Sequence, residues 1–187
     1  RELEVAFVNA SATAQASSGN PRLYVEKYLE QVRHIEIQVI ADQHGNVFAF
    51  DERDCSVQRN HQKMIEESPS PALSAEVRAE MLDAAVRAAQ AVGYTSAGTI
   101  EFLLDDQMNY YFMEMNTRVQ AEHSVTEMVT GTDILQAINR LAAGDPPTSP
   151  HDDTPYSGHA SECRGTAQQP TRGLLSAPST LSPPTRH

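Results

Sequence analysis

The sequence has few basic residues and no long apolar run. Its 187 residues include 14 Lys and Arg against 25 Asp and Glu, which gives a formal net charge of −11. A general nucleic-acid-binding protein would show a basic stripe, so we expect no nucleic-acid partner, and any phosphate chemistry must depend on a few local cations. No apolar run approaches the ~18 residues of a membrane-spanning helix, so no membrane span is expected.

Cysteine is also scarce. Cys55 and Cys163 are the only two, and their spacing fits neither a metal-binding motif nor a disulfide framework. We therefore expect a cytoplasmic protein in which Cys55 is an ordinary small buried residue. The chain starts at Arg1 rather than at an initiator Met, and its first residues lack the apolar segment of a signal peptide. We interpret the chain as a piece of a longer protein.

Three stretches have the apolar spacing of amphipathic helices. Ser74 is a suitable N-cap for the second of them, and Gly93 suits its C-terminus. Gly144 and the prolines after it end the third. The expected helices cover residues 1–17, 75–92 and 133–143.

Strands are predicted where apolar and polar residues alternate. They cover residues 23–29, 34–41, 47–50, 99–104 and 110–115. Residues 51–71 are polar and are expected to form an irregular surface loop. From Asp145 onward Pro, Ser, Thr and Gly dominate, which predicts a weakly structured tail containing one short strand within residues 159–164.

A predicted hairpin places two carboxylates opposite each other. If the chain turns about Gln107 and Met108, Glu101 faces Glu114. Directly opposed side chains have Cβ atoms about 5 Å apart, and like charges there are destabilising, so without a cation one of the two pKa values should rise. A shared proton or an Arg could neutralise the pair. A divalent cation suits the two carboxylates and the nearby Asn116 amide well, because Mg²⁺ is typically bound through one or two carboxylates plus substrate phosphates.

The stretch that follows is polar at every second position. Glu114, Asn116, Arg118, Gln120 and Glu122 would share one face if the chain stayed extended. A solvated edge strand could carry this pattern, although it would seldom place Arg and Glu so regularly. We therefore interpret the stretch as part of a functional site.

The sequence Glu114-Met-Asn-Thr-Arg-Val-Gln-Ala-Glu-His123 resembles the active-site signature of biotin carboxylase, the ATP-grasp component of biotin-dependent carboxylases such as the acetyl- and propionyl-CoA carboxylases. Three further stretches agree in order, at residues 26–38, 52–63 and 93–102. The resemblance extends from about Tyr24 to about Gly144, and continues more weakly through Arg164. Such long, ordered motifs are poorly explained by chance.

The resemblance implies an α+β fold of the ATP-grasp type, with an antiparallel sheet flanked by helices. Residues 1–147 would form the main ATP-grasp subdomain, without the N-terminal domain and most of the lid. Residues 148–187 would be a tail or the truncated start of the biotin carboxylase C-terminal domain. The Gly-rich phosphate loop of the family has no counterpart in the chain, so the fragment alone is expected to be inactive.

The implied reaction is the ATP- and bicarbonate-dependent carboxylation of biotin through carboxyphosphate, with Mg²⁺ or Mn²⁺ bound. The implied partners are a biotin carboxyl carrier domain, a carboxyltransferase and, at full length, a second copy in a homodimer. The resemblance also assigns site residues by motif match. The catalytic residues would be Lys63, Arg118, Glu122 as the general base and Arg164, which would stabilise the biotin enolate; bicarbonate would be bound by Arg118, Gln120 and Ala121. The metal would be bound by Glu101, Glu114 and Asn116, and ATP by Glu26, Lys27, Leu29, His34, Gln58, His61 and Leu103.

The chain departs from the family pattern at two positions in the signature. Ala121 stands where the family usually has Val, which a backbone contact to bicarbonate should tolerate. Ser124 stands where the family usually has Pro, and we expect it to loosen the loop that aims Glu122.

Two alternative functions stay open. One is another ATP-grasp ligase of the carbamoyl-phosphate synthetase type, which also uses bicarbonate and ATP. The spacing Arg118-x-Gln-x-Glu122 favours biotin carboxylase over this alternative. The other is a non-catalytic module that binds nucleotide or takes part in assembly without turnover.

Overall fold

The computed structural model describes residues 1–146, 156–165, 168–169, 173 and 175–176. The chain divides into two units, Arg1–Glu30 and Gln31–His187. The first contains the predicted N-terminal helix, α1 (Glu2–Ser18), which has no buried residue and ends at Gly19. Residues 20–29 form neither helix nor strand, so the strand predicted at 23–29 is wrong. A strand needs a neighbour with which to pair, and this unit contains none.

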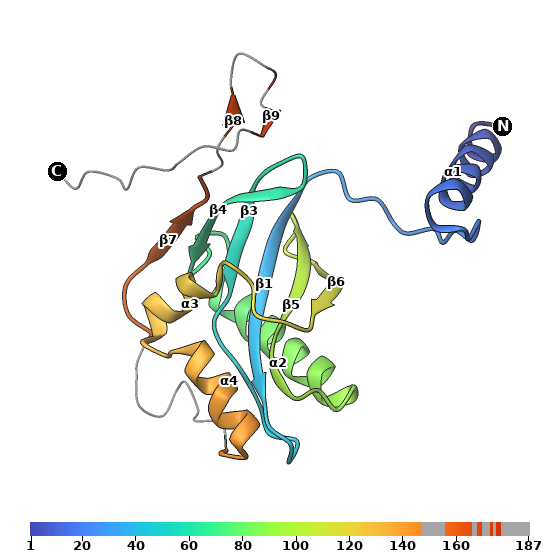
Figure 1. The fold of residues 1–187 in the computed structure, drawn as a ribbon. Helices are drawn as coiled ribbons and strands as arrows, with labels where there is room; N and C mark the ends of the chain where they lie inside the picture. The colour runs from blue at the N-terminus through green and yellow to red at the C-terminus, as the bar shows by residue number, and fades with distance from the viewer. Residues whose placement is uncertain (147–155, 166–167, 170–172, 174, 177–187) are drawn as a thin grey trace. The chain divides into compact units, whose positions relative to one another are not determined.

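The second unit is built on an antiparallel sheet with the strand order β6-β5-β1-β3-β4-β7, and β2 also pairs with β1 (Figure 1). The strands are β1 (Val32–Ala41), β2 (Val47–Ala49), β3 (Arg53–Arg59), β4 (Gln62–Ser68), β5 (Ser96–Asp105), β6 (Tyr110–Asn116) and β7 (Ala160–Cys163). The two short strands β8 (Gln168–Gln169) and β9 (Leu175–Ser176) pair separately. The predicted antiparallel sheet is confirmed, as is the short strand predicted within residues 159–164.

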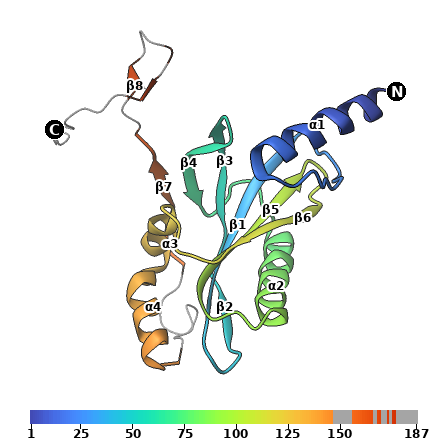
Figure 2. The ribbon, with the colours of Figure 1, turned by 45° about the vertical axis from the view of Figure 1, so that its right-hand side comes forward.

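Helices cover both faces of the sheet. Figure 2 shows α2 (Ala75–Ala91) on one side and α3 (His123–Thr130) and α4 (Ile134–Ala143) on the other. The predicted N-cap is present, because the Ser74 hydroxyl accepts a hydrogen bond from the Val77 amide at 3.3 Å. The helices predicted at 75–92 and 133–143 are confirmed, whereas α3 was not predicted. No helix in the described ranges combines the length and hydrophobicity needed to cross a bilayer.

The alternation of β1 separates an apolar face from a polar one. Its residues Ile35 and Ile37 pack with Met81 of α2 in the larger hydrophobic cluster. Glu36 and Gln38 alternate with these isoleucines and point to the opposite face, which carries α3 and α4. Both are fully buried. The central strands therefore present buried polar groups to one side of the sheet.

The segment 51–71, predicted to be an irregular loop, instead forms the hairpin β3–β4. Its turn residues Asn60 and His61 both have positive φ, at 51° and 61°. Two successive residues of this kind make the tight turn that suits a two-residue hairpin. The prediction was wrong because the strands carry charged residues that are nevertheless buried, such as Arg53 and Glu66.

The predicted register of the β5–β6 hairpin is confirmed, since Glu101 is the Cα partner of Glu114. The extended conformation ends soon afterwards. Strand β6 stops at Asn116, and α3 begins at His123. The extended chain on which the shared face depended therefore reaches only to Asn116, where the chain leaves the sheet.

The fold predicts a large effect of truncating Met81, which is fully buried between α2 and the sheet. Replacing it with Ala removes buried apolar atoms and leaves a cavity, so the free energy of unfolding should fall by about 2–5 kcal/mol. Urea denaturation measures this change. The neighbouring Glu80 is exposed on the same helix, so Glu80→Ala should stay within about 0.5 kcal/mol of the wild type. Equal effects of the two substitutions would contradict the packing of α2 described above.

Candidate active site

The ammonium group of Lys63, on β4, lies among three buried carboxylates. Its Nζ is 3.0 Å from Oε1 of Glu101 on β5 and 2.6 Å from Oε1 of Glu122, which directly precedes α3. It also donates a hydrogen bond to Oε1 of Glu36 on β1. The three carboxylate side chains are at most 4% exposed. Burial opposes the charge on Lys63, but the carboxylates outweigh it and raise the pKa of the amine.

Strand register creates this cluster. Glu36 is the Cα partner of Glu101 across β1 and β5, and of Arg53 across β1 and β3. Two carboxylates in directly opposed positions repel each other, so cations must lie close by. Lys63 and Arg53 supply them from the two strands of the β3–β4 hairpin.

Arg53 is fully buried and connects the sheet to the segment around α3. Its guanidinium donates hydrogen bonds to Gln38 and Thr126 (both 2.9 Å), Thr99 (3.2 Å), and Glu36 and Gln120 (both 3.3 Å). Sequence reasoning missed Arg53, Glu36 and Thr126. The usable signal for Glu36 was that it and Gln38 alternate with the apolar residues Ile35, Ile37 and Val39 in one strand.

The carboxylate of Glu101 accepts hydrogen bonds on both of its oxygens. Its Oε1 accepts from Lys63, from Asn116 Nδ2 and from Gln120 Nε2, the last two at 2.8 Å. Its Oε2 is 2.8 Å from His34 Nε2. Burial alone would raise the pKa of Glu101, but the contacts with His34 and Lys63 hold it well below its usual range. Glu101 is therefore not the member of the pair whose pKa rises, because these donors compensate the repulsion.

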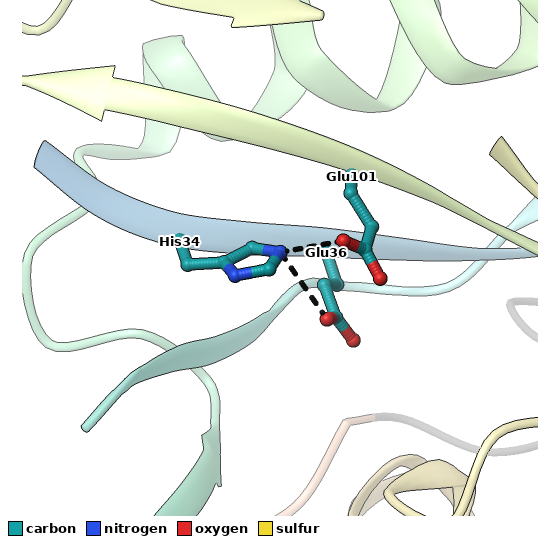
Figure 3. A group of neighbouring side chains, drawn as sticks. All are labelled: His34, Glu36 and Glu101. Carbon is teal, nitrogen blue, oxygen red and sulfur yellow. Dashed lines mark hydrogen bonds and ion pairs between the residues drawn. The ribbon is translucent and has the colours of Figure 1, made fainter. Parts of the chain in front are cut away.

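The imidazole of His34 points between Glu36 and Glu101 (Figure 3). Gln58 Nε2 is 2.8 Å from both the Cys55 carbonyl oxygen and His34 Nδ1. A carbonyl oxygen only accepts, so one N–H of the Gln58 amide donates to it. The other N–H donates to Nδ1 of His34. We therefore assign the proton of the neutral ring to Nε2, which donates to Glu101. One ring nitrogen of His34 and one carboxylate oxygen each of Glu36 and Glu101 lie within 4.8 Å of one another, as the ligands of a metal ion would. In this tautomer, however, hydrogen bonding already connects the three side chains.

Glu114 and Asn116 complete the predicted metal group. Asn116 Nδ2 donates to Glu101 at 2.8 Å and to Glu114 at 3.1 Å, so the amide holds the two carboxylates together. Two carboxylates and an amide oxygen are the hard ligands that Mg²⁺ and Mn²⁺ prefer. The residues therefore fit a divalent cation, provided that the Asn116 amide turns over to present its oxygen.

A cavity of about 460 Å³ opens beside the carboxylate cluster. Its lining includes four cationic side chains and one carboxylate: Arg59, Lys63, Arg118, Arg164 and Glu122. Such an excess of positive charge suits an anion. The predicted bicarbonate residues Arg118, Gln120 and Ala121 all lie in this wall.

Glu122 lies between two cations at the edge of the cavity. Its Oε1 accepts from Lys63, and its Oε2 accepts from Arg164 Nη2 at 2.6 Å. Burial would raise the pKa of Glu122, but Lys63 and other nearby donors lower it to about 2. Arg164 Nε is also 2.7 Å from the buried Glu66 of β4, so this arginine bridges two carboxylates.

The turn before α3 is tied to β7. The Ser124 hydroxyl donates a hydrogen bond to Glu162 of β7, two residues before Arg164. The expectation that Ser124 loosens this turn is not what the structure shows. Ser124 and Arg164 both connect the segment around Glu122 to the same strand.

Four of the residues predicted to contact ATP lie in the second unit. They are His34, Gln58, His61 and Leu103. His34 and Leu103 are Cα partners on β1 and β5, and His61 lies in the β3–β4 turn and lines the cavity. The other three belong to the first unit, which is described separately: Glu26, Lys27 and Leu29. The role of each of these seven residues toward ATP stays a prediction.

The fold is that of an ATP-binding domain. The family model described as "Carbamoyl-phosphate synthase L chain, ATP binding domain" matches residues 1–148, and the chain belongs to this family. Its curated relatives include biotin carboxylase 1 of Bacillus subtilis, 53% identical over 166 residues, and biotin carboxylase of Nostoc, 51% identical over 176 residues. These matches cover 88% and 94% of the chain but only 37% and 39% of the relatives, so the chain spans about two fifths of their length.

Solved structures agree with this assignment. A Campylobacter jejuni biotin carboxylase in complex with β,γ-ATP superposes with a TM-score of 0.85 at 46% identity, over 92% of this chain and 39% of that one. The biotin carboxylase domain of Hydrogenobacter thermophilus 2-oxoglutarate carboxylase, a dimer with MgADP, ADP and bicarbonate, gives 0.83 at 45% identity, over 94% and 39%. The predicted ATP-grasp fold is confirmed by both.

The lowered pKa of Glu122 predicts a loss of stability in acid. A carboxyl group with a folded-state pKa of about 2, against an ordinary value of 4.5, contributes stability above pH 4.5 that is lost as the pH falls toward 2. Urea denaturation at several pH values in this window should show a shallower decline for Glu122→Gln than for the wild type. Glu80→Gln, on an exposed helix position, should decline like the wild type. Parallel curves for wild type and Glu122→Gln would show that the carboxylate does not stabilise the fold.

Proposed function

We propose that this chain forms part of a biotin carboxylase active site. MgATP and bicarbonate would react to carboxyphosphate, and the carboxyl group would pass to N1 of biotin on a carrier. The observation that carries the proposal is the position of Glu122, bonded to both Lys63 and Arg164 in the wall of a cationic cavity. Solved relatives with nucleotide and with bicarbonate support the choice of substrates.

Glu122 is the proposed general base toward bicarbonate. A base works best when its pKa is near the operating pH, and a pKa of about 2 makes the resting carboxylate a weak base. An anion in the cavity competes with Glu122 for Lys63 and Arg164. As these cations turn to the anion, the pKa of Glu122 rises toward the useful range. Substrate binding would thus activate the base that acts on it.

Arg118 is the proposed bicarbonate-binding residue. Its side chain is exposed at the cavity, and its Nη1 donates to the Val119 carbonyl at 3.3 Å. A guanidinium presents paired N–H donors that match a planar anion. Gln120 and the backbone at the exposed Ala121 would complete the pocket.

The metal would be held by Glu101, Glu114 and Asn116. When bound, Mg²⁺ or Mn²⁺ neutralises the phosphates and favours phosphoryl transfer. The chain's own contribution is to aim Glu101, which His34 and Gln120 hold by hydrogen bonds at 2.8 Å. Lys63 and Arg164 would then stabilise negative charge on the transferring phosphoryl group and on the biotin enolate, respectively.

The context of the whole protein is also a proposal. Residues 1–147 would belong to the main ATP-grasp subdomain and residues 148–187 to the start of the next domain. A biotin carboxyl carrier and a carboxyltransferase would be partners, as the relatives include methylcrotonoyl-CoA carboxylase subunit alpha and propionyl-CoA carboxylase alpha chain. The whole protein would form a homodimer, as the Hydrogenobacter domain does. Its compartment would be the cytoplasm.

A carbamoyl-phosphate synthase reaction is the second candidate, because the matching family model carries that name. Both reactions start from ATP and bicarbonate, but they differ in the acceptor. A chimera in which this chain replaces the matching segment of Bacillus subtilis biotin carboxylase 1 separates them. Bicarbonate-dependent ATP cleavage stimulated by free biotin supports the first function, whereas stimulation by ammonia supports the second. We expect no biotin-dependent turnover from the 187 residues alone, whose cavity is open to water.

The role of Glu122 is testable in the same chimera. Glu122→Gln keeps the shape and one hydrogen-bonding oxygen but removes the proton acceptor, so biotin-dependent turnover should fall by about 10²–10⁴-fold. MgATP affinity, measured by calorimetry, should change little. Glu80→Gln serves as the control for removing an acidic charge. A parallel loss of MgATP binding in Glu122→Gln would mark the carboxylate as structural instead.

A further inference from the structure

We propose that Lys63 is a resident cation of the carboxylate cluster, which competes with the divalent metal for Glu101 and so sets the metal affinity of the site. The proposal rests on the function proposed above for the presence of a divalent cation at Glu101. It adds a step that the metal ligands alone do not reveal: the protein's own ammonium group must leave Glu101 when the metal binds.

The oxygen that Lys63 contacts is already saturated. Oε1 of Glu101 accepts hydrogen bonds from Lys63 at 3.0 Å and from Asn116 and Gln120 at 2.8 Å. A carboxylate oxygen has two lone pairs, so three donors already exceed its capacity. A metal ion that takes one of these lone pairs leaves room for one donor, so it has to displace two of the three.

Lys63 is the donor that a metal would displace. Gln120 is 4% exposed, and its own amide oxygen is held by Arg53 at 3.3 Å. Asn116 gives up its hydrogen bond to Glu101 when it turns its amide oxygen toward the metal, so either Lys63 or Gln120 has to leave as well. Lys63 alone carries a full positive charge, which repels a divalent cation in contact with the same carboxylate.

The ammonium group of Lys63 can leave Glu101 and move toward the cationic cavity. Lys63 also contacts Glu122 and lines the cationic cavity, and its side chain is the most exposed member of the cluster at 14%. Its four-carbon stem lets the charge move from Glu101 toward the cavity while Lys63 keeps its contact with Glu122. Metal binding at Glu101 would therefore deliver a cation to the place where the anion binds, which couples the two events.

The test measures Mn²⁺ binding to the 187-residue chain by electron paramagnetic resonance of the free ion, without nucleotide. In Lys63→Met the competing charge is gone, and Mn²⁺ should bind at least about tenfold tighter than to the wild type. Arg87→Met is the matched control, because it removes a positive charge from an exposed position on α2, and it should bind Mn²⁺ like the wild type. Equal or weaker Mn²⁺ binding by Lys63→Met, or no binding by either chain, overturns the proposal.

A second measurement on the wild type covers the case in which Lys63→Met does not fold. The chain has only two lysines, Lys27 and Lys63, so ¹⁵N-lysine labelling gives two ammonium signals. Saturating Mg²⁺ should shift the Lys63 signal and leave that of Lys27 in place as the internal reference. A Lys63 signal that does not move at saturating Mg²⁺ would falsify the exchange.

Failure of this proposal can be told apart from failure of the proposed function. A chimera without biotin-dependent turnover, combined with tighter Mn²⁺ binding by Lys63→Met, would refute the biotin carboxylase function and retain the exchange. Biotin-dependent turnover of the chimera, combined with unchanged Mn²⁺ affinity in Lys63→Met, would support the biotin carboxylase function and refute the exchange.

Discussion

The structure depends on the neutralisation of three carboxylates that are buried in one place. An ionised carboxylate inside a protein is costly unless cations and hydrogen-bond donors surround it, and removing one partner leaves an uncompensated buried charge. Here Glu36, Glu101 and Glu122 share the cations Lys63 and Arg53, which come from the two strands of one hairpin. The hairpin, the central strands and the segment before α3 are therefore stable only together.

The apolar face of the sheet fixes the register that makes this neutralisation possible. On β1, Ile35 and Ile37 must face α2, which turns Glu36 to the opposite side. A slip of one residue would exchange the two faces and bury a carboxylate among apolar side chains. The hydrophobic contacts of α2 thus hold the polar groups in place, although no residue of that helix belongs to the site.

The sequence predicted the elements that have a local signature. The helices at 75–92 and 133–143, the strand at 34–41 and the pairing of Glu101 with Glu114 follow from periodicity, caps and turn symmetry. The hairpin β3–β4 could not be recognised in this way, because its buried Arg53 and Glu66 have the composition of a surface loop.

Burial of a charge is decided by a partner that is distant in sequence. Arg53 donates a hydrogen bond to Thr126, which is 73 residues away in the sequence, and Lys63 donates one to Glu122, which is 59 residues away. Pattern reasoning has no access to such pairs. The motif resemblance identified Lys63 and Glu122 one by one, but not the contact between them. It assigned no role to Glu36 or Arg53, although both lie in stretches that carry the resemblance.

This mutual neutralisation constrains how the site can work. In the structure, an ammonium group occupies the proposed metal ligand Glu101. The proposed base Glu122 is held by Lys63 and Arg164, and the contact with Lys63 lowers its pKa and makes it weakly basic. Neither group is available while these contacts last. A cation that binds Glu101 and an anion that binds the cavity both act on Lys63, the first by repelling it and the second by attracting it. Each ligand therefore lowers the cost of binding the other, because both favour the same displacement of one charge. Coupling of this kind needs no movement of the backbone, since the ammonium group only has to exchange partners within reach of its own side chain.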